Sequence, residues 1–252
     1  MVMKNKSFLN REKPSLVCMV QADNPDRIKE LIDLSLTEGA EAFGMQFCKM
    51  KPEHRNKEIY NELFKYSSLP TYVTNYRHSH NQDKSDDTLA AELLELAECG
   101  ATLCDVMGDI FDATEGELTM NEEAVKKQMT LIDELHARGA EVLMSSHVLK
   151  YTPAERVLEI AFEHQRRGAD ICKIVTSADT MAEQIENLRI IDLLRQNLKI
   201  PFLFLCGGEC RILRRIGGNI GNCMSLCVHE YDELATSSQP LLSHMNKLRD
   251  LL

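Results

Sequence analysis

The sequence predicts a single-domain α/β protein of the (β/α)8 TIM-barrel class. Short apolar runs alternate strictly with longer amphipathic runs, which gives eight predicted strands and eight predicted helices. Eight such units in 252 residues match the size of this fold. Glycine tolerates the left-handed conformation at a helix C-terminus, and a Gly-Ala pair ends four of the predicted helices. These pairs begin at Gly39, Gly100, Gly139 and Gly168.

The apolar runs predict strands over residues 15–22, 42–48, 71–77, 102–107, 141–147, 170–176, 201–206 and 223–228. The amphipathic runs predict helices over residues 26–37, 54–66, 87–98, 122–137, 153–167, 181–196, 211–216 and 240–252. Asp86, Asn121 and Thr152 are predicted N-caps, with Pro153 at the first helical position. Residues 1–14 form a polar N-terminal extension to one domain over residues 1–252. An open doubly wound sheet is the alternative, disfavoured because no Gly-x-Gly-x-x-Gly motif follows the first strand.

Composition narrows the class of partner. A net charge of −10 argues against nucleic acid or an anionic membrane, because both require basic patches. The nine cysteines are odd in number and contain no Cys-x-x-Cys pair, which favours reduced thiols packed as small hydrophobes. No signal peptide is visible, and no apolar run approaches the roughly 20 residues that span a bilayer. We therefore expect a soluble, cytoplasmic protein.

Lys173 is the most informative residue for function. It lies in the apolar run Ile171-Cys172-Lys173-Ile174-Val175 on the predicted sixth strand. A strand between helices is covered on both faces, and lysine is almost never fully buried without a partner. Burial disfavours the ammonium form, and the neutral amine attacks carbonyl carbon. The alternative is a lysine at a strand end whose amine reaches water, and this segment alone leaves both interpretations open.

His147 ends the predicted fifth strand. Strand periodicity places Ile171, Lys173 and Val175 on one face. If that face lines the barrel, His147 and Lys173 lie on neighbouring strands about 4.8 Å apart and can converge on one substrate. The alternative for His147 is a structural role. His78-Ser79-His80 is predicted to lie in a loop rather than to bind a metal, and no metal site is predicted.

Several segments together resemble the type I 3-dehydroquinate dehydratases, from about residue 15 onward. The matching segments are Ser145-Ser146-His147, Thr152-Pro153, Gly168-Ala169-Asp170-Ile171-Cys172-Lys173-Ile174 and Gly207-x-Glu209-x-Arg211-Ile212-x-Arg214. Val73-Thr74-Asn75-Tyr76-Arg77 is similar to the family's Thr-Phe-Arg segment.

The resemblance implies a role for each matching residue. Lys173 would form an imine with the substrate ketone, and His147 would act as general acid and base. Arg214 and Gln239 would bind the substrate carboxylate, and Arg77 would make a further polar contact. The implied reaction converts 3-dehydroquinate, a small carboxylated ketone, to 3-dehydroshikimate in the shikimate pathway of aromatic amino acid biosynthesis. The resemblance implies no metal or organic cofactor, and a homodimer.

Three positions depart from the family pattern. Gly44 and Gln46 stand where the family has Glu-x-Arg, and Met107 stands where it has a glutamate that orients the histidine. Asp105 and Asp109 share strand parity with Met107, so they are the expected replacements as partner of His147. These departures leave two alternatives open. One is a Schiff-base dehydratase or aldolase-like enzyme for another carboxylated ketone, and the other is a catalytically silent barrel that binds a ligand.

Overall fold

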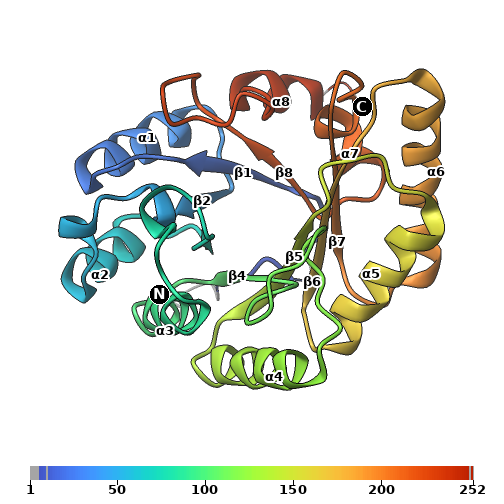
Figure 1. The fold of residues 1–252 in the computed structure, drawn as a ribbon. Helices are drawn as coiled ribbons and strands as arrows, with labels where there is room; N and C mark the ends of the chain where they lie inside the picture. Colours follow the sequence, from blue (N-terminus) through green and yellow to red (C-terminus); the bar gives the residue numbers. More distant parts are fainter. Residues whose placement is uncertain (1–5, 10, 250, 252) are drawn as a thin grey trace.

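The computed structural model describes residues 6–9, 11–249 and 251, and it is an eight-stranded parallel barrel (Figure 1). The strand order is β7-β6-β5-β4-β3-β2-β1-β8, so consecutive strands are neighbours. The strands are β1 Ser15–Val20, β2 Ala42–Gln46, β3 Thr71–Thr74, β4 Leu103–Met107, β5 Glu141–His147, β6 Ile171–Ser177, β7 Phe202–Gly207 and β8 Met224–Cys227.

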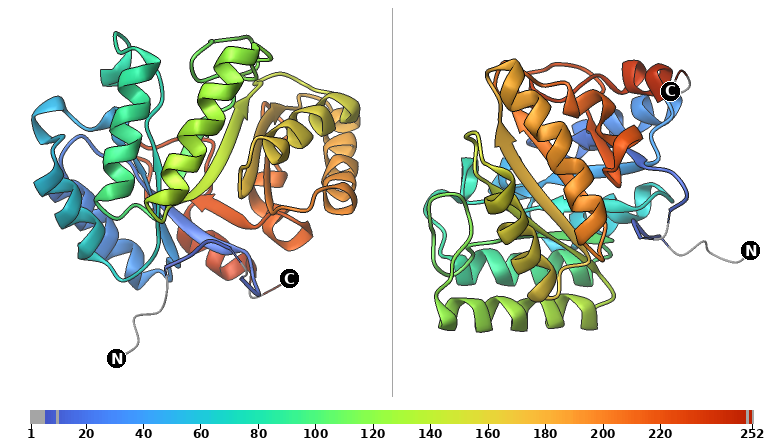
Figure 2. Two further views of the ribbon diagram at one scale, coloured as in Figure 1. Left: turned by 90° about the horizontal axis from the view of Figure 1, so that it is seen from below. Right: turned by 90° about the vertical axis from the view of Figure 1, so that its right-hand side faces the viewer.

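One helix follows each strand, and together the helices surround the sheet in sequence order (Figures 1 and 2). They are α1 Pro25–Thr37, α2 Lys57–Tyr66, α3 Asp86–Glu98, α4 Glu122–Ala137, α5 Ala154–Arg166, α6 Met181–Asn197, α7 Leu213–Ile220 and α8 Leu242–Arg249. Three short 3-10 helices lie in the loops, at Phe47–Lys49, Pro52–His54 and Ser79–Asn81.

A backbone bond and a side-chain amide connect β7 to β8, where the regular ladder is missing. The backbone N–H of Cys223 donates to the Phe202 carbonyl at 2.9 Å. The Asn222 amide accepts from the Phe204 N–H at 2.8 Å and donates to the Phe204 carbonyl at 3.0 Å. The amide thus pairs both backbone groups of one strand residue, which closes the barrel.

Two layers of apolar side chains hold the barrel together, in keeping with a parallel sheet covered on both faces. The outer layer joins strands to helices. The inner layer fills the barrel, with Leu103, Leu143, Ile171 and Leu203 among its buried members. Phe8 packs against this inner layer, and its N–H donates to the Glu141 carboxylate at 2.8 Å at the start of β5. The N-terminal end of the barrel is therefore covered, and the C-terminal end is left for loops.

The predicted fold class is confirmed, and the differences are confined to element ends. All four predicted junction glycines have positive φ, between 82° and 115°. Asn121 caps α4 as expected. The caps of two other helices were wrong by one residue, because Ser85 caps α3 and Pro153 caps α5. The end of the predicted last helix falls on residues 250 and 252, which lie outside the described part.

All nine cysteines are free thiols, as expected. Within the described residues, no helix is both long and apolar enough to cross a membrane.

Candidate active site

Lys173 lies in the barrel interior, and only 4% of its surface is exposed. Its Nζ donates hydrogen bonds to the Tyr76 hydroxyl at 2.7 Å, the Tyr72 hydroxyl at 3.0 Å and Asp105 Oδ2 at 3.1 Å. The alternative of an amine that reaches water from a strand end is therefore wrong. Neighbouring Ile171 and Val175 belong to the inner apolar layer, so the predicted face of β6 is confirmed.

Asp105 is the counter-ion of Lys173. Its carboxylate is fully buried and accepts hydrogen bonds from the hydroxyls of Tyr72, Tyr76 and Ser145. Burial raises the pKa of Asp105, but the charge of Lys173 and these hydrogen bonds outweigh burial and hold the pKa below its ordinary value. Burial raises the pKa of both tyrosines well above the usual range. The resting cluster is an ammonium–carboxylate pair between two neutral phenols.

His147 lies on the neighbouring strand, one step nearer the C-terminal end of the barrel. Ser145 pairs with Lys173 in the β5–β6 register, and His147 pairs with Val175. The His147 ring packs edge-on against Tyr76, with 5.2 Å between ring centroids. One side chain, Tyr76, thus touches both Lys173 and His147.

Glu117 is the carboxylate partner of His147. Its Oε2 lies 2.6 Å from His147 Nδ1 and also accepts the His147 backbone N–H at 3.0 Å. A histidine whose Nδ1–H donates to a carboxylate presents a lone pair at Nε2 when neutral. The expectation that Asp105 or Asp109 would orient His147 was wrong, because Asp105 pairs with Lys173 and Asp109 with Arg77. Burial raises the pKa of Glu117, but the hydrogen bond and charge of His147 outweigh burial and lower it.

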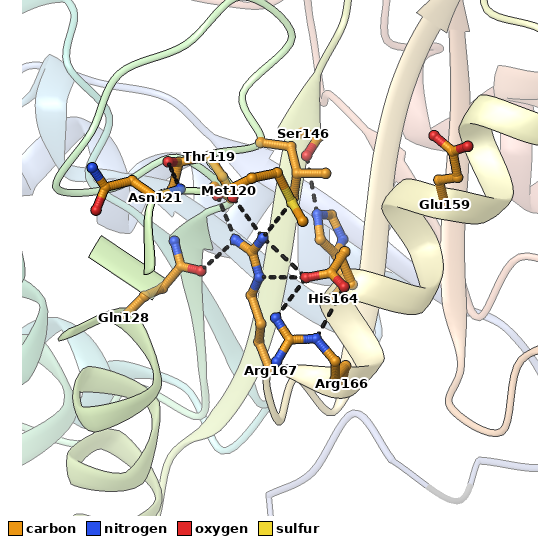
Figure 3. A network of polar contacts seen from close by, with 12 residues as sticks. Thr119, Met120, Asn121, Gln128, Ser146, Glu159, His164, Arg166 and Arg167 are labelled. Carbon is orange, nitrogen blue, oxygen red and sulfur yellow. Dashed lines mark hydrogen bonds and ion pairs between the residues drawn. The ribbon is translucent and has the colours of Figure 1, made fainter. Parts of the chain in front are cut away.

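The β4–α4 loop that carries Glu117 is fixed by buried polar contacts (Figure 3). Ser146 Oγ donates to the Glu117 carbonyl at 2.6 Å and lies 3.0 Å from His164 Nε2. The Arg167 guanidinium, with no exposed side-chain surface, donates to the carbonyls of Gly108 at 3.0 Å and Thr119 at 2.6 Å. These bonds hold both ends of the loop.

Glu117 itself has a φ of 52°. Non-glycine residues adopt this left-handed conformation at a cost, so the bonds to its loop hold a strained residue against His147.

Arg77 lies just beyond the end of β3. Its Nη1 donates to Asp109 Oδ1 at 2.7 Å, and its Nε donates to Asp86 Oδ1 at 2.7 Å. The guanidinium therefore links the end of β3 to α3 and to the β4–α4 loop. Because two carboxylates already neutralise Arg77, its contact with a substrate stays a prediction.

Arg214 and Gln239 both have unused hydrogen-bonding capacity. Arg214 Nε donates to the Cys206 carbonyl near the end of β7 at 2.9 Å, and no carboxylate pairs with Arg214 in the described part of the chain. Burial lowers the pKa of Arg214. Gln239 is buried in the β8–α8 loop, and its Oε1 has no hydrogen-bond partner among the described residues. A desolvated guanidinium without a counter-ion suits an anionic ligand group.

Gly44, Gln46 and Met107, which depart from the expected pattern, make no ion pair among the described residues. A Cβ built at Gly44 would lie 2.1 Å from Met19 Sδ, so Met19 occupies the space that a side chain at 44 would fill. Gln46, at the end of β2, has a buried Oε1 without a partner among the described residues. Met107 is buried in the apolar core. The β2 side of the barrel therefore holds no charged replacement for Glu-x-Arg at these strand positions.

His78 is placed beside the site rather than in a ligand cluster. Its ring lies 5.8 Å from the Tyr76 ring, and its Nδ1 lies 3.7 Å from Cys48 Sγ. In the residues that the structure describes, no group of three or more His, Cys, Asp or Glu side chains could hold a metal ion.

The parallel barrel and the polar cluster at its centre define a (β/α)8-barrel protein with a candidate active site built on β3, β4, β5 and β6. A family model of type I 3-dehydroquinase matches residues 17–252. The chain therefore belongs to the type I 3-dehydroquinase family.

Curated relatives agree with this family. The chain is 25% identical over 162 residues to a 3-dehydroquinate dehydratase of Desulfotalea psychrophila, an alignment that covers 64% of this chain and 65% of the relative. It is 31% identical over 93 residues to that of Alkaliphilus oremlandii, covering 36% of each chain. The matched segments thus span less than two thirds of these relatives.

The 3-dehydroquinate dehydratase structure of Geobacillus kaustophilus has a TM-score of 0.82 at 14% identity, covering 98% of this chain and 95% of that one. The type I enzyme of Clostridium difficile, solved with covalently modified comenic acid, has a TM-score of 0.79 at 16% identity and covers 96% and 93%. At these identities the structures support the fold alone.

Proposed function

We propose that this protein is a type I 3-dehydroquinate dehydratase-like lyase that eliminates water from 3-dehydroquinate to give 3-dehydroshikimate. Lys173 forms a Schiff base with the substrate ketone, and His147 is the general acid and base. The observation that carries the proposal is the buried amine of Lys173, 3.1 Å from Asp105, with a carboxylate-bound histidine on the next strand. Family membership supports the same reaction.

The imine makes the elimination feasible without a metal or an organic cofactor. The neutral amine of Lys173 attacks the ketone carbon. The ketone oxygen takes one proton from the amine nitrogen and one from His147 and leaves as water, while the nitrogen lone pair forms the C=N bond. The resulting iminium withdraws electrons from the adjacent carbon, so a base of moderate strength removes the proton there. His147 takes this proton and gives it to the hydroxyl at the next carbon, which leaves as water. A water molecule then hydrolyses the iminium, which releases the product ketone and regenerates the amine of Lys173. Acid–base assistance of this kind contributes about 10²–10⁴-fold.

Substrate recognition is assigned to Arg214, Gln239 and Arg77. Arg214 has no carboxylate partner within the described chain, so it can donate two parallel hydrogen bonds to a substrate carboxylate. Gln239 is assigned to the same carboxylate site, and its buried side chain has an Oε1 without a partner among the described residues. Arg77 is assigned a further polar contact, or the support of the loop through Asp109.

A second candidate keeps the lysine chemistry but changes the ketone. Met19 fills the space above Gly44, and Gln46 is neutral, so these two positions of β2 carry no charged group that would select ring hydroxyls. This favours a carboxylated ketone with fewer hydroxyl groups.

The proposal also includes a homodimer in the cytoplasm acting in the shikimate pathway, and light scattering after size-exclusion chromatography tests the dimer.

Turnover of 3-dehydroquinate tests the function, since the conjugated product absorbs in the ultraviolet. We expect turnover by the wild type and none by Lys173→Met, which keeps a chain of similar length without an amine. Lys150→Met, at an exposed lysine just beyond β5, is the matched control and should turn over normally. Activity on another carboxylated ketone alone would favour the second candidate. Turnover by Lys173→Met would contradict both, and no activity with any ketone would indicate a silent barrel.

A further inference from the structure

Tyr76 contacts the amine of Lys173, its counter-ion Asp105 and the ring of His147. Its hydroxyl is 2.7 Å from Lys173 Nζ, the shortest of the three contacts of that amine, and it donates to Asp105 Oδ2. Its ring packs against His147. Tyr72 also contacts Lys173 and Asp105, but it lies deeper, with 0% of its surface exposed against 8% for Tyr76. Tyr76 therefore lies on the side of the cluster that faces the strand ends.

The resting cluster poses a chemical problem for imine formation. An ammonium held by a carboxylate has no lone pair, so Lys173 must lose a proton before it attacks a ketone. His147 is held by Glu117 at Nδ1, and its other nitrogen is assigned to the substrate oxygen. The remaining acceptor among the described contacts of the amine is Asp105, reached directly over 3.1 Å or through the hydroxyl of Tyr76 or Tyr72. Tyr76 is the closer of the two phenols, at 2.7 Å against 3.0 Å, and lies nearer the strand ends.

On the basis of the proposed Schiff-base function, we propose that Tyr76 is a catalytic residue that relays the proton from Lys173 to Asp105. An N–H bond of the ammonium breaks as its proton joins the Tyr76 oxygen, and the former Tyr76 proton moves to Asp105 Oδ2. The products are a neutral amine, a phenol and a carboxylic acid, with no change in the number of electrons. The phenol is regenerated in the same step, so Tyr76 is never required to exist as a phenolate.

The test measures how fast the substrate becomes trapped on the enzyme. Wild type, Tyr76→Phe and Tyr60→Phe are mixed with excess 3-dehydroquinate, quenched with borohydride at short times and analysed by mass spectrometry. Tyr76→Phe keeps the ring against His147 but removes the relay, so adduct formation should slow by at least about tenfold. Tyr60→Phe is the matched control, because Tyr60 is a buried tyrosine that packs on Phe47 in the outer apolar layer, and it should keep the wild-type rate of adduct formation. Equal rates for wild type and Tyr76→Phe, or equal slowing by both variants, would overturn the relay.

A second measurement tests the relay on the wild type alone, so its outcome does not depend on whether a variant folds. The relay moves two exchangeable protons in one step. A plot of the rate of adduct formation against the deuterium fraction of the water should therefore curve downward, because both protons contribute to the isotope effect. A straight line, which reports one proton, would overturn the relay in favour of direct transfer to Asp105. Absence of any adduct on the wild type would instead refute the Schiff-base function itself, and the two failures are thereby distinguished.

Discussion

Replacing Glu117 by glutamine should slow the enzyme about tenfold without moving its loop. Glu117 Oε2 accepts two hydrogen bonds from His147, at 2.6 Å from Nδ1 and 3.0 Å from the backbone nitrogen. Glutamine keeps an oxygen in the same place but removes the negative charge. That charge stabilises the imidazolium that forms each time His147 takes a proton.

The magnitude follows from the strength of the bond between Glu117 Oε2 and His147 Nδ1. A hydrogen bond to a charged group contributes about 1.5–3 kcal/mol, against about 0.5–1.5 kcal/mol between neutral groups. Glu117→Gln loses this difference of about 1–1.5 kcal/mol, and each 1.36 kcal/mol corresponds to about tenfold in rate. Glu117→Ala loses both bonds and frees the ring, so kcat/KM should fall by about a hundredfold.

The same carboxylate gives a pH-dependent contribution to stability. The folded-state pKa of Glu117 is lowered by His147, so its contribution is present above the unfolded pKa of about 4.3 and is lost as pH falls through the lower folded value. The difference in unfolding free energy between wild type and Glu117→Gln should therefore be largest near neutral pH and disappear in acid.

Steady-state dehydratase kinetics and urea unfolding measure both effects. Glu115→Gln is the matched control, because Glu115 lies in the same loop, is exposed and pairs with Lys150. It should leave kcat/KM unchanged. Wild-type activity in Glu117→Gln, or an equal loss in Glu115→Gln, would refute the assignment of Glu117 as the partner of His147.

Three further predictions test the surroundings of the site. Burial lowers the pKa of His164 to about 3, so between that pH and about 6.5 only the unfolded chain binds a proton at this residue. On acidification from pH 6 to 4, the unfolding free energy of the wild type should therefore fall faster than that of His164→Gln, by up to about 1.4 kcal/mol per pH unit. Equal slopes for the two proteins in urea unfolding would contradict this. Gly44→Ala should lower the unfolding free energy by about 1–3 kcal/mol, because the added methyl group collides with Met19. The loss should be smaller when Met19 is also replaced by alanine. Strictly additive effects of the two substitutions would show that the two positions do not compete for space. Arg214→Ala should lower kcat/KM by about ten- to a hundredfold, mainly by raising KM, because it loses the group that binds the substrate carboxylate. Arg215→Ala, at an exposed neighbouring arginine, should keep wild-type kinetics. An unchanged KM for Arg214→Ala would show that Arg214 does not bind the substrate.

The fold and the position of the amine followed from local patterns. The alternation of apolar and amphipathic runs has the two periods that distinguish strands from helices, and the four glycines lie where helix ends require positive φ. Strand parity placed Lys173 on one face of the strand with Ile171 and Val175, and the structure shows that this face lines the barrel interior.

The partners of Lys173 and His147 did not follow, for two physical reasons. Parity assigns a residue to a face but not to a level in the barrel, and the strand register decides the level. Asp105 pairs with Leu143 in the β4–β5 register, one step below Ser145, and therefore reaches Lys173 rather than His147. Glu117 comes from a loop 30 residues before His147, with a backbone conformation that no local motif announces.

The contacts of Arg77 depend on long-range packing as well. The sequence marked this arginine as a substrate contact by resemblance, but its two carboxylate partners come from α3 and from the β4–α4 loop. No pattern in the sequence predicts a role for Tyr72, and Tyr76 stands out only as part of the segment similar to Thr-Phe-Arg. Their hydroxyls acquire a role only once the barrel brings Asp105 and Lys173 between them.

The most direct test of the account is the location of the trapped substrate. The protein is incubated with 3-dehydroquinate and borohydride, digested, and mapped by mass spectrometry. The account predicts one reduced adduct on the peptide that contains Lys173, absent from Lys173→Met. An adduct on another lysine, or no adduct while the protein still turns the substrate over, would contradict Schiff-base catalysis by Lys173.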